Sequence, residues 1–139
     1  MENTSESAPS AQSIWHVEGV PCPGIDELID KWYLDTPKQG DEVVDDAAIS
    51  VRGWALSSEE TQSRLHIVLR FRDRTQSHAL NVDRVDVVKA VLDAEEPSVH
   101  PQLRCGFNYS VAMGDAVEGF EIGFEIDGYI YSVAKVFAR

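Results

Sequence analysis

Apolar and polar residues alternate in several short runs along the chain, and this alternation is its dominant pattern. Successive side chains of a β-strand point to opposite faces, so each run predicts a strand with one buried face. The clearest run is RLHIVLRFR, residues 64–72. Its expected inward residues are Leu65, Ile67, Leu69 and Phe71.

Further runs carry the same two-residue period. In AAISVRGWAL, Arg52 and Trp54 fall on the face opposite to the apolar residues Ile49, Val51 and Ala55. CGFNYSV and GFEIGFEID continue the alternation toward the C-terminus, and YIYSVAKVFA is the last run. The dipeptide Asp127–Gly128 separates the last two runs, and this pair between alternating segments is typical of a tight β-hairpin.

A segment with helical spacing interrupts the alternation. In RVDVVKAVLDAEE, residues 84–96, apolar side chains recur at the intervals of one helix face. They are Val85, Val88, Val91 and Leu92. We therefore expect a short helix that crosses from one sheet to another. Asp83 is the expected N-cap, and Asp86 falls in the first turn, where a carboxylate meets unpaired amides.

The N-terminal third is less regular. Apart from Met1, residues 1–13 contain no large apolar residue, which predicts a disordered tail at 1–13 before a single domain at 14–139. Residues 25–32 have helical spacing, although KWYLDTP at 31–37 fits a strand equally well. Residues 26–46 hold eight acids and two lysines, a composition that predicts a solvated loop.

Six or so strands, one crossing helix and short turns predict an all-β chain, an antiparallel β-sandwich of the immunoglobulin-like kind. A small barrel is the alternative.

The net charge of −12 argues against nucleic acid and anionic membranes as partners, since both need a basic surface. No segment has the length and apolarity of a membrane span or a secretory signal, so we expect no membrane insertion and a cytoplasmic location.

The cysteines and histidines offer the first candidate chemistry. His16 with Cys22, and His100 with Cys105, could together form a tetrahedral metal site, but neither pair has the close spacing of a zinc knuckle. Cys105 lies on the apolar face of its run, where a thiol is more often buried than nucleophilic. We expect no metal, no cofactor and no catalytic activity.

Aromatic and charged residues on one sheet face offer the second candidate. Trp54 shares its face with Arg52, and a flat apolar ring beside polar groups is a common way to hold a sugar. Burial of Trp54 in a sandwich core is the alternative. Arg84 and Asp86 stand two residues apart, either as a structural latch at the strand-to-helix corner or as part of a polar ligand site. The predicted ligand-binding residues are therefore Trp54, Arg52, Arg84 and Asp86.

Four short motifs together resemble a known kind of bacterial domain. They are YLDTP (33–37), ISVRGWAL (49–56), DRVDVVKAV (83–91) and CGFNYSV (105–111). Their order and spacing resemble the small β-sandwich accessory modules of glycosyltransferases, methyltransferases and sulfotransferases that build bacterial surface polysaccharides. Those modules usually have a proline after the arginine of the third motif, where this chain has Val85.

The resemblance implies a non-catalytic module that binds carbohydrate or serves a glycan-modifying enzyme. A protein-interaction or assembly domain is the alternative, with the acidic 26–46 segment or a sheet edge facing a protein partner. An exposed Trp54 near Arg84 would favour the first hypothesis, and salt-sensitive association without a response to sugars would favour the second.

Overall fold

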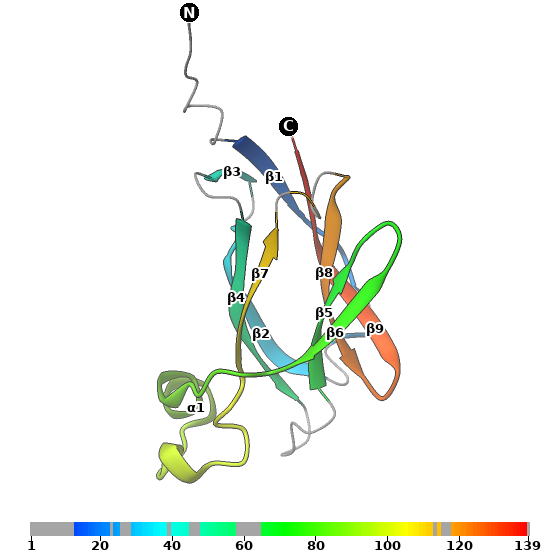
Figure 1. Cartoon of the computed structure of the whole chain (residues 1–139). Helices are drawn as coiled ribbons and strands as arrows, with labels where there is room; N and C mark the ends of the chain where they lie inside the picture. The colour runs from blue at the N-terminus through cyan, green and yellow to red at the C-terminus, as the bar shows by residue number, and fades with distance from the viewer. Residues whose placement is uncertain are drawn as a thin grey trace, which may run out of the picture.

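The described part of the chain folds as two antiparallel β-sheets that face each other, with one α-helix at one end (Figure 1). The computed structural model describes residues 13–22, 24–25, 29–38, 40–44, 48–57, 65–112, 114 and 118–138. The strands are β1 (Ser13–Gly19), β2 (Ile29–Thr36), β3 (Gly40–Val44), β4 (Ala48–Ser57), β5 (Leu65–Arg70), β6 (Thr75–Ala79), β7 (Gly106–Ala112), β8 (Phe120–Ile126) and β9 (Tyr129–Ala138). The predicted all-β sandwich with one helix is confirmed.

One sheet has six strands in the order β3-β1-β9-β8-β5-β6, and the other has three in the order β2-β4-β7. All neighbouring strands are antiparallel. The alternating runs identified in the sequence correspond to β4, β5, β7, β8 and β9, and the apolar faces of β4, β5 and β8 point inward as predicted. In the run that contains β7, Phe107 and Val111 lie in the core, whereas Cys105 packs in the separate cluster under the helix.

The N-terminal third departs from the sequence-based expectation. The helical interpretation is wrong beyond residue 28, because Ile29–Thr36 is a strand; residues 26–28 lie outside the described part of the chain. The expected acidic loop contains β3, which pairs with β1. Ser13, assigned to the tail, begins β1, and residues 1–12 also lie outside the described part.

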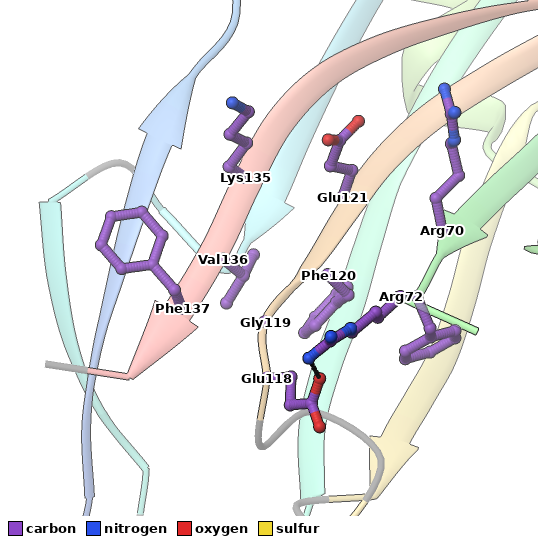
Figure 2. Close-up of a pocket in the computed structure, with 10 residues that line it drawn as sticks. Arg70, Arg72, Glu118, Gly119, Phe120, Glu121, Lys135, Val136 and Phe137 are labelled. Atoms are coloured by element: carbon purple, nitrogen blue, oxygen red, sulfur yellow. Dashed lines mark hydrogen bonds and ion pairs between the residues drawn. The ribbon is translucent and has the colours of Figure 1, made fainter. Parts of the chain in front are cut away.

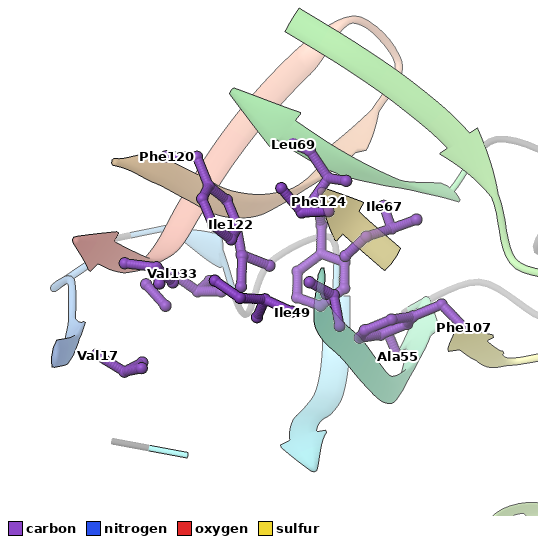
Figure 3. Close-up of a cluster of buried hydrophobic side chains, with 14 of the residues drawn as sticks. Val17, Ile49, Ala55, Ile67, Leu69, Phe107, Phe120, Ile122, Phe124 and Val133 are labelled. Carbon is purple, nitrogen blue, oxygen red and sulfur yellow. The ribbon is translucent and has the colours of Figure 1, made fainter. Parts of the chain in front are cut away.

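A single apolar core fills the space between the two sheets (Figure 3). Phe124 of β8 lies near its centre and is fully buried. Its ring centroid lies 5.8 Å from that of Trp32 on β2 and 5.9 Å from that of Phe107 on β7. Aromatic contacts thus join the six-stranded sheet to both edge strands of the three-stranded sheet.

The helix α1 (Val85–Leu92) follows β6 and packs on the outer face of the three-stranded sheet. Val87 and Val88 are buried there and pack against Leu56 of β4 and Cys105. The predicted crossing helix is confirmed, but its apolar face is rotated, since Val85 is 45% exposed. No helix in the described ranges is long and apolar enough to span a bilayer.

The hairpin between β8 and β9 turns at Asp127–Gly128, as predicted. Both residues have positive φ, 54° and 84°. A two-residue turn with left-handed backbone at both positions follows the right-handed twist of its strands, which explains why Asp-Gly is favoured there.

Candidate functional site

The outer face of the three-stranded sheet carries both predicted residues of β4. Arg52 and Trp54 point away from the core, because Val51 and Ala55 of the same strand are buried in it. Trp54 stands opposite Tyr33 of β2, and Arg52 stands opposite Asn108 of β7. Directly opposed residues on one face lie within side-chain contact range, so these four belong to one surface.

A hollow of about 320 Å³ lies on this surface. It is lined by Asp35, Arg52, Gly53, Val82, Arg84, Phe107 and Asn108. Arg52 and Arg84 are predicted ligand-binding residues from two different segments of the sequence, and in the structure they line the same hollow. Asp86 and Trp54 lie beside it rather than in its lining.

The position of Arg84 depends on the segment before the helix. Val82 forms a bridge with Gly106 of β7, and the Arg84 amide donates a hydrogen bond to the carbonyl of Leu103 at 2.8 Å. A Cβ atom added to Gly106 would lie 2.8 Å from the Arg84 Cγ atom and 2.9 Å from the Val82 Cβ atom. The missing side chain of Gly106 therefore lets the Arg84 stem lie directly on the sheet.

Paired asparagines hold the same segment against β7. The Asn108 amide donates to the Asn81 side chain at 3.0 Å, and the Asn81 side chain donates back to the Asn108 carbonyl at 3.4 Å. The Tyr109 hydroxyl also donates to the carbonyl of Ala79. These bonds join the end of β6 to the edge of the other sheet and fix the starting point of α1.

The Arg84 guanidinium binds two carboxylates. Its Nε and Nη2 atoms donate to the two Asp86 carboxylate oxygens at 3.0 and 2.8 Å, and its Nη1 atom lies 3.5 Å from Asp35 Oδ2. The contact expected between Arg84 and Asp86 is thus present. Arg84 itself occupies the N-cap position, so the expectation for Asp83 is wrong; that carboxylate instead accepts a hydrogen bond from Arg104 at 3.0 Å.

The two aromatic side chains of the surface differ in exposure. Tyr33 is 49% exposed, whereas Trp54 is half-buried, because it also packs against the apolar cluster under α1. The predicted ligand-binding residues did not include Tyr33, Asp35 or Asn108. The first two alternate with the inward Trp32 and Leu34, so choosing the strand alternative for residues 31–37 would have placed them on this face.

The candidate metal ligands do not form a site in the described part of the chain, where no three His, Cys, Asp or Glu side chains converge. His16 instead packs on the ring of Phe137, with centroids 5.1 Å apart, and His100 Nδ1 accepts a hydrogen bond from the Gln102 amide. Cys105 is fully buried, as the sequence predicts.

Burial controls the reactivity of the two thiols. It raises the pKa of Cys105 to about 11 and also raises the pKa of the partly exposed Cys22. Because the thiolate is the reactive form, we expect a disulfide reagent at neutral pH to modify Cys22 and to leave Cys105 intact until the chain unfolds. A Cys22→Ser variant should lose the native reaction. Reaction of both thiols at similar rates in native protein would contradict the burial of Cys105.

The Arg84 contact sets the ionisation of Asp86. Hydrogen bonds from Arg84 hold the pKa of the Asp86 carboxyl below its ordinary value. The resulting stabilisation is fully present above the ordinary aspartate pKa and is lost as pH falls through the lower folded value. NMR titration should therefore show the Asp86 pKa rising in Arg84→Gln. In Arg104→Gln, which removes the neighbouring pair with Asp83, the Asp86 pKa should remain low.

No family model, no curated protein and no solved structure matches this chain.

Proposed function

We propose that this chain is a non-catalytic carbohydrate-binding accessory module of bacterial surface-polysaccharide assembly, acting in the cytoplasm. The observation that carries the proposal is the pairing of Tyr33 and Trp54 beside the polar hollow on the outer face of β2-β4-β7. The order of motifs that resembles accessory modules of glycan-modifying enzymes supports the same role.

The chemistry of the surface suits a sugar. The apolar face of a pyranose packs on flat aromatic rings, while its hydroxyls need donors and acceptors at the ring edge. Tyr33 and Trp54 supply the aromatic surface, and the exposed Arg52 and Asn108 side chains supply polar contacts. Asp35, 38% exposed, adds a carboxylate acceptor.

The role of Arg84 in this proposal is positioning. Its donors already face Asp86 and Asp35, so it holds the Asp35 carboxylate at the rim of the hollow instead of clamping the ligand itself. Arg84→Gln should then weaken sugar binding through the displacement of Asp35. A non-catalytic role also fits the burial of the Cys105 thiol, because a buried thiol cannot reach a substrate.

Two tyrosine variants test the proposal. Binding of the chain to an array of bacterial surface glycans should identify one or more ligands, and Tyr33→Ala should weaken that binding by about tenfold or more. Tyr129→Ala is the matched control, because Tyr129 is 65% exposed but lies in the β8–β9 hairpin. An array without ligands, or equal losses in the two variants, would overturn the proposal.

A further inference from the structure

A second surface, at one end of the six-stranded sheet, is hollowed and basic. Two adjoining hollows of about 500 and 490 Å³ share Phe71, Arg72, Glu118 and Gly119 in their linings. We call them together the basic groove. It lies where β5 ends, β8 begins and β9 ends (Figure 2). The candidate carbohydrate surface lies on the three-stranded sheet β2-β4-β7, and its hollow shares no lining residue with this groove.

The groove reverses the charge balance of the chain. Among the residues that the structure describes, four Lys or Arg side chains line it against three Asp or Glu side chains, on a chain with 12 Lys and Arg and 24 Asp and Glu in all. The basic residues are Arg70, Arg72, Arg74 and Lys135, and the acidic residues are Asp73, Glu118 and Glu121. A locally basic surface on a chain of net charge −12 concentrates attraction for anionic groups at one place.

Two of these cations carry no ion pair with any side chain in the described part of the chain. Lys135, Glu121 and Arg70 stand directly opposite one another on β9, β8 and β5, and Figure 2 shows their side chains extending on the same side. The Glu121 carboxylate accepts a hydrogen bond from the Ser132 hydroxyl at 2.7 Å. Among the described residues, neither Arg70 nor Lys135 has a carboxylate within 4.0 Å.

The third cation is held loosely. Arg72 lies 2.8 Å from Glu118, but the two side chains are 82% and 56% exposed. Ion pairs this exposed contribute little to stability because water screens them, so an incoming carboxylate can replace Glu118 at small cost. The groove can therefore offer Arg70, Arg72 and Lys135 to one anionic ligand.

Apolar surface lies between these charges. Phe137 is 38% exposed at one side of the groove, and Phe120 and Val136 form its buried floor (Figure 2). Phe71 stacks on Phe120 with ring centroids 5.6 Å apart. A ligand that suits this surface carries both carboxylates and an apolar side chain.

We infer that the basic groove binds an acidic peptide segment of a partner protein, with an apolar side chain of the peptide against Phe137. Charge complementarity favours an acidic peptide over the two alternatives. A basic peptide would require an acidic groove. Nucleic acid would require a chain that is basic overall, whereas this chain is acidic. An accessory module with this groove could dock on an enzyme through one sheet and hold sugar on the other.

A charge-matched pair of peptides tests the inference. A fluorescein-labelled peptide of alternating Glu and Leu should bind the chain at low salt and dissociate as salt rises, while a Lys-and-Leu peptide reports any binding to the acidic remainder of the surface. Arg70→Gln combined with Lys135→Gln should weaken binding of the acidic peptide by about tenfold. Lys89→Gln, at an exposed position of α1, and Arg104→Gln together provide the control with the same change in charge.

Phe137→Ala should weaken the acidic peptide further than it weakens a Glu-and-Ser peptide, which reports the apolar contact. No binding of the acidic peptide at low salt would overturn the inference, and so would equal losses in the groove variant and the control variant. Self-association that the groove variant abolishes, measured by analytical ultracentrifugation, would assign the groove to a second copy of the chain and would also overturn it.

Discussion

Replacing Phe124 with alanine should lower the free energy of unfolding by about 3–5 kcal/mol. Phe124 is fully buried and contacts aromatic rings from both edge strands of the opposite sheet, so its loss leaves a cavity that neighbouring side chains cannot fill. Urea denaturation followed by tryptophan fluorescence measures the change.

Phe137→Ala is the matched control for that experiment. Phe137 is 38% exposed, and its truncation should cost less than about 1.5 kcal/mol. Similar costs for the two variants would contradict the placement of Phe124 at the centre of the core.

Gly53→Ala should destabilise the chain by about 3 kcal/mol, the upper part of the range for overpacked cores. A Cβ atom at Gly53 would collide with the carbonyl oxygen of Tyr33 and lie 2.8 Å from the Phe107 ring. Both neighbours are fixed, the first by the pairing of β2 with β4 and the second by the core. The strands must separate, and Tyr33 then moves relative to the hollow.

Gly114→Ala provides the comparison, since a Cβ atom at Gly114 would meet no heavy atom of the other described residues within 4 Å. Thermal unfolding should place Gly114→Ala within a degree or two of wild type and Gly53→Ala about 10 °C or more below it. A Gly53→Ala protein as stable as wild type would show that β2 and β4 are not packed as described.

The sequence predicted the strands whose side chains alternate over a whole run. In β4, β5 and β8 the two-residue period is uninterrupted on the buried face, and the Asp-Gly turn fixes the neighbour of β8. Ile29 and Trp32 of β2 are three residues apart, a spacing that also fits one face of a helix, so local pattern could not decide between the two. β3 is only five residues long, and two of its residues are acidic. It pairs with β1, which lies far from it in the sequence, so the local pattern could not predict this pairing.

The same distinction applies to the candidate site. The contact of Arg84 with Asp86 is local, because the two residues are two positions apart, and the sequence anticipated it. The meeting of Arg84 with Arg52 depends on the bridge between Val82 and Gly106, which joins segments far apart in the chain. No pattern within either segment encodes that bridge. The close approach allowed by Gly106 becomes visible only in three dimensions.

The most direct test of the proposed carbohydrate surface is an NMR titration of the three tryptophan indoles with bacterial surface sugars and nucleotide sugars. Trp15 is buried in the core and Trp32 packs against it, so their indole signals serve as internal references for Trp54. We predict shifts at the Trp54 indole and at the amides around Arg52 and Asn108, with Trp15 unchanged. A spectrum that stays unchanged across millimolar sugar, or one in which all three indoles shift alike, would contradict sugar binding at Trp54.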